Sequence, residues 1–180
     1  MPLVLSVVWG LLLGLGSGGS LRGLGGVRLR FPYLLLLAFL VQGAARGRLG
    51  VPGASSWSVL VWGLVSLALI AVLLIQRDSP TLVVVAIGIA LNLLVVLLNG
   101  FMPIFAGPGV DPADVAQGLS GGRGFYALGT PETLAAVLAD GLLLPVLGRQ
   151  YLLSLGDVLL VCGASGFLVS SMLRPYDPEL

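Results

Sequence analysis

The sequence predicts an all-α fold, a polytopic transmembrane helical bundle of about five membrane helices with a structured interfacial or extramembrane segment before the last helix. Hydrophobic residues make up 57% of the 180-residue chain and charged residues only 9%, whereas soluble domains carry about 25% charged residues. The mean hydropathy is +1.08. Apolar runs that approach the ~20 residues needed to cross a hydrocarbon core recur along the chain. We therefore expect residues 1–180 to form a single membrane domain.

About four apolar helices are expected within residues 1–98. The first, from about Pro2 to Gly19, places glycines at four-residue spacing on one face, where another backbone can approach closely; these are Gly10, Gly14 and Gly18. This run lacks the basic region and the small-residue cleavage site of a secretory signal, so we expect it to be retained as a helix. The next apolar run, Phe31–Ala45, is short for a full span unless it tilts or the bilayer thins.

Two longer apolar runs, Trp57–Ile75 and Thr81–Leu98, have the length of complete spans. The first run opens with a tryptophan and carries Trp62 one turn and a half later, which suits a membrane interface. Asn92 and Asn99 are seven residues apart and therefore share one helix face. Asn92, deep in its span, is expected to form a hydrogen bond to another helix.

Residues 99–155 differ from the rest, because prolines, glycines and most of the acids collect there. We expect an interfacial segment with short amphipathic helices around Pro112–Leu119 and Pro131–Leu147. In the second of these, Thr130 is the expected N-cap and proline takes the first helical position. The last transmembrane helix is predicted over residues 156–174.

The arginines indicate the orientation, because cytoplasmic connections carry an excess of basic residues. With the amino terminus outside and the carboxyl terminus in the cytoplasm, five arginines are cytoplasmic and four are external. The cytoplasmic set is Arg22, Arg28, Arg30, Arg77 and Arg174, and the external set is Arg46, Arg48, Arg123 and Arg149. The count favours this orientation.

Composition also excludes several kinds of chemistry. The chain has no histidine, which removes Ser/His/Asp and Cys/His nucleophile activation, bis-histidine haem ligation and the commonest zinc ligand sets. The single cysteine, Cys162, excludes an intrachain disulfide and a CxxC site. With a net charge of +1 there is no basic patch for nucleic acid. We expect no cofactor, no metal and no nucleic-acid partner.

Three polar residues near span boundaries are candidates for chemistry: Asn99, Asp140 and Asp157. Each also has a structural interpretation. Asp157 can cap the last helix, Asp140 can be a solvated residue on an interfacial helix, and Asn99 with its following glycine can form a helix C-terminal turn. Because the segment between Asn99 and Asp157 starts and ends at one membrane face, the three can converge. Two carboxylates sharing a proton activate water without a histidine.

Several motifs together resemble a family of small bacterial membrane proteins known only as a domain of unknown function. The motifs are Gly18-Gly19-Ser20-Leu21, Gln42, Ala90-Leu91-Asn92-Leu93-Leu94-Val95-Val96, Asn99-Gly100, Met102-Pro103, Asp140 and Ser154-Leu155-Gly156-Asp157. The resemblance spans nearly the whole chain. It implies a multi-pass protein of the bacterial cytoplasmic (inner) membrane and brings no established activity.

The last third is also similar to the type II (lipoprotein) signal peptidases, through Ala139-Asp140, Ser154-Leu155-Gly156-Asp157 and Asn99-Gly100-Phe101. This likeness implies that Asp140 and Asp157 form a catalytic pair and that Asn99 supports them. Three departures stand against it: Ser154 replaces the expected asparagine, no arginine-bearing motif precedes the first aspartate in the usual place, and the expected number of helices differs.

The leading functional hypothesis is a non-catalytic accessory or structural subunit of a larger bacterial membrane protein assembly. It is based on the glycine packing faces and on the scarcity of reactive side chains. The expected partners are the lipid bilayer and other membrane protein subunits, or further copies of the chain. The alternative is an intramembrane aspartyl peptidase with an Asp140/Asp157 dyad, and a small transporter is the third hypothesis.

Overall fold

A computed structural model describes residues 2–27, 29–33, 37, 40, 56–76, 78–106, 113, 125–146 and 149–174. The helices are α1 (Pro2–Gly16), α2 (Leu21–Gly25), α4 (Ser56–Ile75), α5 (Pro80–Asn99) and α7 (Leu155–Met172). The strands are β1 (Met102–Ile104), β2 (Tyr126–Leu128), β3 (Leu142–Val146) and β4 (Arg149–Leu153), and a 3-10 turn, η1, spans Ala136–Leu138. The described part of the chain is thus mostly helical.

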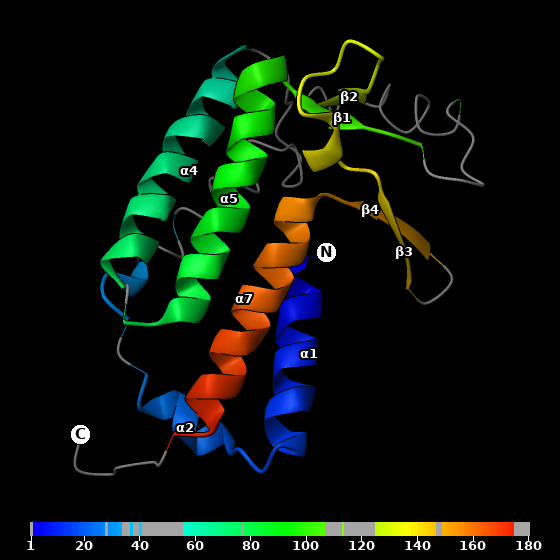
Figure 1. Cartoon of the computed structure of the whole chain (residues 1–180). Helices are drawn as coiled ribbons and strands as arrows, with labels where there is room; N and C mark the ends of the chain where they lie inside the picture. Colours follow the sequence, from blue (N-terminus) through cyan, green and yellow to red (C-terminus); the bar gives the residue numbers. More distant parts are fainter. Residues whose placement is uncertain are drawn as a thin grey trace.

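The long helices stand side by side in the order α1, α7, α5, α4 (Figure 1). Helix α5 is antiparallel to both neighbours, whereas α1 and α7 run in the same direction. The short helix α2 lies at the lower ends of the long helices, and the strands lie at their upper ends (Figure 1). Within the described residues, α1 packs mainly on α7 and α4 mainly on α5, so each forms an edge of the row.

Glycines bring α5 and α7 into backbone contact. A Cβ at Gly88 would lie 2.6 Å from the carbonyl oxygen of Gly156, and one at Gly163 would lie 2.7 Å from the carbonyl oxygen of Thr81. Real Cβ atoms do not approach backbone atoms this closely, so these positions require glycine. Close backbone approach of this kind is how helices associate in a lipid environment.

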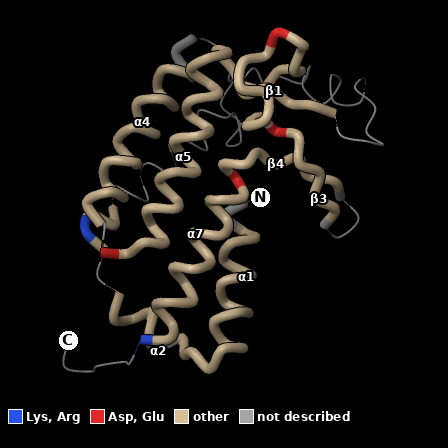
Figure 2. Tube along the Cα trace, in the orientation of Figure 1, with Lys and Arg blue, Asp and Glu red and all other residues tan. Residues whose placement is uncertain are grey.

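Two helices are long and apolar enough to cross a membrane, Pro80–Asn99 and Leu155–Met172, and shorter apolar helices cover Val4–Gly16 and Val59–Ile75. Only 44% and 33% of the two long segments are buried within the chain, whereas the core helix of a soluble protein is mostly buried. Charged residues lie at helix ends and in connections (Figure 2). Most of the predicted span from Phe31 to Ala45 lies outside the described residues, so a bundle of about five spans is not confirmed.

The structure corrects the prediction for the segment before α7. The helix expected from Pro131 to Leu147 is replaced by η1 and by strand β3, and Thr130 caps no helix there. Instead, the backbone N–H of Thr130 donates to Oγ1 of Thr133 in a turn, 2.8 Å away. Pairing with β4 competes successfully with helix formation in the Leu-rich run of β3. The other expected helix, Pro112–Leu119, lies outside the described residues apart from residue 113.

The strands form two small pairs. Strand β1 is parallel to β2, with Met102 opposite Tyr126, and β3 forms an antiparallel hairpin with β4, with Leu142 opposite Leu153. Figure 1 shows the hairpin extending away from the row of helices. An isolated β-bridge joins Ile104 to Asp140 and so links the two pairs.

An apolar core fastens β1 and β2 to the ends of α4 and α5. Its buried members are Trp62, Leu93, Val95, Val96, Met102 and Phe125. The ring of Trp62 meets that of Phe125 edge to face, with centroids 5.0 Å apart. Trp62 is only 1% exposed, because its ring is packed among these residues; its expected position near a membrane interface stays a prediction.

Candidate functional site

A buried polar network joins the middle of α5 to the start of α7. The amide Nδ2 of Asn92 donates to Oδ1 of Asp157 over 3.1 Å, and the hydroxyl of Ser154 donates to Oδ1 of Asn92 over 2.8 Å. The backbone N–H of Asp157 in turn donates to Oγ of Ser154, 2.9 Å away. The side chains of Asn92 and Ser154, with the carboxylate and the backbone N–H of Asp157, form a closed set of hydrogen bonds across the α5–α7 contact.

The local sequence explains why these groups meet. Ser154 is the N-cap of α7, and Asp157 lies in the first turn, where a carboxylate interacts favourably with the helix dipole. Between them, Gly156 leaves space for the amide of Asn92, because a Cβ at that position would overlap Oδ1 of the amide. The capping role expected for Asp157 therefore belongs to Ser154, and the carboxylate of Asp157 bonds to the neighbouring helix.

Asp140 lies beside this network, at the base of the β3–β4 hairpin. Its backbone N–H donates to the carbonyl oxygen of Pro103 over 3.0 Å, and its carbonyl oxygen accepts from the N–H of Phe105 over 2.8 Å. The next residue, Gly141, donates its N–H to the carbonyl oxygen of Leu153. The hairpin thus returns the chain from Asp140 to the start of α7.

Both aspartate side chains are buried. Asp140 is 7% exposed and Asp157 is 8% exposed. Helix α7 also contacts η1, which ends just before Asp140. Asp140 therefore does not lie solvated on an interfacial helix, as one interpretation of the sequence expected. Burial of an ionisable side chain is costly and marks a residue for a functional or structural role.

Asn99 lies at the other end of the same connection and holds the turn before η1. Its amide Nδ2 donates to the carbonyl oxygen of Leu134 over 3.0 Å, and its Oδ1 accepts from the N–H of Leu134 over 3.0 Å. Gly100 follows with φ of +74°, so α5 ends in the left-handed turn that this pair of residues favours. In the same turn region, a hydrogen bond from the Thr130 side chain holds the pKa of Glu132 below its usual value.

The three glycines predicted to pack α1 have different surroundings. A Cβ at Gly10 would lie 2.8 Å from Cδ1 of Leu168, and one at Gly14 would lie 2.5 Å from Sδ of Met172, so both face α7. Gly18 lies beyond the end of α1 with φ of +82° and nothing within 4 Å of its Cβ position. It belongs to the turn that leaves the helix and not to the packing face.

The described residues hold no group of three His, Cys, Asp or Glu side chains that suits a metal ion. The hydrogen bonds of Asn92, Ser154 and Asp157 hold α5 and α7 together. The backbone hydrogen bonds of Asp140 hold the segment before β3 against residues 103–105, and they show no contact between its carboxyl group and that of Asp157. The roles of Gly88, Gly156 and Gly163 in helix contact were not predicted; the available signal was a small residue on each of two apolar helices.

Comparison with known proteins places the chain in a family. No curated protein and no solved structure matches it. Residues 26–169, which include α4, α5, all the strands and most of α7, match a family of unknown function. The buried network and both aspartates lie within the matched range, and the chain belongs to this family of unknown function, DUF5317.

Proposed function

We propose that the protein is a multi-pass protein of the bacterial cytoplasmic membrane that acts as a non-catalytic accessory or structural subunit of a larger membrane assembly. The observation that carries this proposal is the open row of helices, in which the outer face of α1 is left uncovered within the described residues. Its exposed large apolar side chains are Val4, Val7, Val8, Trp9, Leu12, Leu13 and Leu15. Such a face suits lipid or the helix of another subunit.

The buried polar network supports a structural role. Asn92, Ser154 and Asp157 satisfy one another across the α5–α7 contact, and an interhelical hydrogen bond is the usual use of an asparagine at membrane depth. This arrangement favours a rigid scaffold over a reaction centre.

Photo-crosslinking in the native membrane tests the assembly. A photoreactive residue at Leu12, which is 58% exposed, is expected to capture another polypeptide, either a different subunit or a second copy. The same residue at Ser6, which is buried against α7, is the control and should capture only this chain. A monomer in mild detergent, with no crosslink from Leu12 or from other exposed positions on α1, overturns the proposal.

The distribution of charge supports an external amino terminus. Arg22, Arg30 and Arg174 gather at the α2 end of the row, and basic residues favour the cytoplasmic side. We expect the strand segment to be external. In a Cys162→Ser background, a membrane-impermeant maleimide should label Glu132→Cys in intact cells and Ser20→Cys only after permeabilisation, and the reverse pattern would invert the orientation.

A second function, intramembrane aspartyl peptidase, is favoured by one observation: the β3–β4 hairpin returns the chain from the buried Asp140 to Leu153, four residues before the buried Asp157. The similarity to type II signal peptidases suggests a lipid-modified signal peptide as substrate. Under this hypothesis, cleavage by purified protein is abolished by Asp140→Asn and by Asp157→Asn and retained by Glu132→Gln. Cleavage that persists in both aspartate variants removes the hypothesis.

A further inference from the structure

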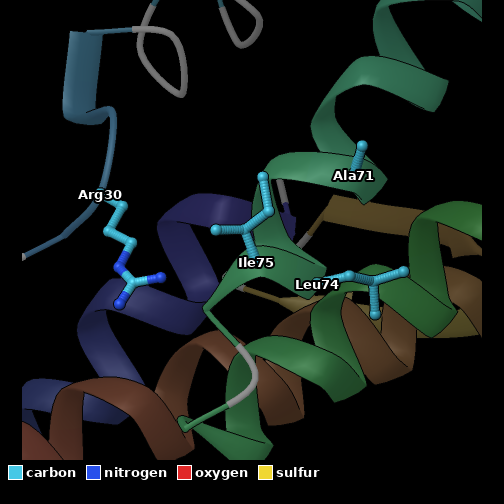
Figure 3. Close-up of a pocket in the computed structure, with 4 residues that line it drawn as sticks. All are labelled: Arg30, Ala71, Leu74 and Ile75. Carbon is cyan, nitrogen blue, oxygen red and sulfur yellow. The ribbon is translucent and has the colours of Figure 1, made fainter.

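An open hollow of about 400 Å³ lies at the end of the bundle opposite the strands. It is lined by Arg30, Ala71, Leu74 and Ile75. Figure 3 shows the Arg30 side chain on the segment that follows α2, with the three apolar side chains on the last turns of α4. The hollow therefore combines one cationic group with an aliphatic wall.

The backbone at Arg30 is fixed by its neighbours. Leu29 packs against an apolar cluster made by the lower halves of α4 and α5. The backbone N–H of Arg30 donates to Oε1 of Gln76 over 3.3 Å, and the Gln76 side chain is itself buried. The segment is thus held against the end of α4, while the Arg30 side chain remains exposed.

No carboxylate among the described residues forms an ion pair with Arg30. The Arg30 side chain is exposed and borders the hollow, where an anion from outside the chain can reach the guanidinium. Arginine binds phosphate through two parallel N–H donors and retains its charge in a partly apolar setting. A free inorganic anion would use the guanidinium alone and would leave the aliphatic wall without a partner.

A continuous apolar stripe leads away from the hollow along α4. Exposed side chains at helical spacing form it, with Ala71 between the two halves: Leu60, Leu64, Leu67, Leu74 and Ile75. These positions recur at intervals of three or four residues, so they share one face of the helix. A lipid acyl chain can therefore lie along the stripe while its headgroup reaches the Arg30 guanidinium.

We propose that this hollow binds an anionic phospholipid, with the Arg30 guanidinium on the headgroup phosphate and one acyl chain along the exposed stripe of α4. The proposal rests on the membrane location proposed above. It fits the cytoplasmic placement of the α2 end, since the cytoplasmic leaflet carries anionic lipids that attract arginines near the surface. The occupant is a diacyl lipid with a net negative headgroup, of the phosphatidylglycerol class.

Lipid retention in native mass spectrometry tests the site. The full chain is reconstituted in bilayers of phosphatidylcholine and phosphatidylglycerol, extracted in mild detergent, and compared with Arg30→Gln and with Arg22→Gln. Arg22 is the matched control, because it is an exposed arginine on α2 at the same end but does not line the hollow. We expect the protein to retain phosphatidylglycerol preferentially, Arg30→Gln to weaken that preference about 5-fold, and Arg22→Gln to leave it unchanged.

Equal retention of the two lipids by the unmodified chain, or equal losses in the two arginine variants, overturns the proposal. Inorganic phosphate at millimolar concentration should not displace the lipid; complete displacement would assign the site to a free anion. Leu74→Asn should lower retention of both lipids, and no change there would contradict the acyl track. If the chain is not an integral membrane protein, carbonate washing will release it from membranes, and this result is distinct from a loss of lipid preference.

Discussion

Replacing Gly88 by alanine tests the close packing of α5 on α7. The new Cβ would lie 2.6 Å from the carbonyl oxygen of Gly156 and 3.1 Å from the backbone nitrogen of Leu160. Backbone atoms cannot rotate away as a side chain can, so the two helices must separate. Overpacking of this kind costs about 1–3 kcal/mol, and the better helix propensity of alanine returns up to ~1 kcal/mol. We expect a net loss of about 1–2 kcal/mol in the free energy of unfolding.

The matched control is Gly63→Ala on α4. Its Cβ would lie 3.7 Å from Cδ1 of Leu93, an ordinary van der Waals distance to a mobile side chain, so the helix propensity gain should leave stability unchanged or slightly higher. Thermal unfolding in one detergent, followed by circular dichroism, compares the variants. We expect Gly88→Ala to lower the midpoint by about 2–8 °C. Equal midpoints for the two variants would show that the α5–α7 contact is not as close as described.

Three further outcomes are expected. Asn92→Leu should lower the unfolding midpoint more than Asp157→Asn does. The leucine leaves Ser154 and Asp157 without a hydrogen-bond partner, at a cost of about 1–3 kcal/mol, whereas the side chain introduced by Asp157→Asn still offers an oxygen to Nδ2 of Asn92. A larger effect of Asp157→Asn would contradict this. Asn99→Leu should speed amide hydrogen exchange in the turn that it holds without changing exchange in the mid-bundle helices, and uniform acceleration would refute a local role. Gly14→Leu should disrupt detergent stability more than Asp157→Asn and more than Gly16→Leu, whose Cβ position is open; similar midpoints for all three would count against glycine packing.

The helices could be predicted from the sequence because hydropathy alone defines them. The spans expected at Trp57–Ile75 and Thr81–Leu98 correspond to α4 and α5, with ends shifted by a residue. Each depends on a continuous apolar run and on a polar turn, which are local properties. The interhelical hydrogen bond of Asn92 and the helix-ending turn at Asn99 could also be predicted, because each follows from a local feature: a polar residue deep in an apolar run, and an asparagine followed by glycine.

The strands and the glycine contacts could not be predicted, because each depends on a distant partner. Strand β1 is three residues long and pairs with β2 more than twenty residues later, and no local pattern specifies such a pairing. Likewise, Gly88 requires glycine only because Gly156 faces it. A glycine on one apolar helix indicates that a backbone can approach, but it does not identify which backbone.

The buried polar network lies well below the end of α5, and the strand segment reaches down to it. Asn92 lies seven residues before Asn99, the last residue of α5, and is therefore ~10 Å below that end of the helix. If α5 spans the bilayer, the start of α7 and the base of the hairpin lie within or just below the interface. Non-helical backbone is tolerated there only when its polar groups are satisfied within the protein.

The hydrogen bonds of the connecting segment meet that requirement at the positions nearest the network. The N–H and carbonyl groups of Asp140 pair with Pro103 and Phe105, and Gly141 pairs with Leu153, while Ser154 satisfies the first turn of α7. The strand segment is thus the part of the fold that allows α7 to begin opposite the middle of α5.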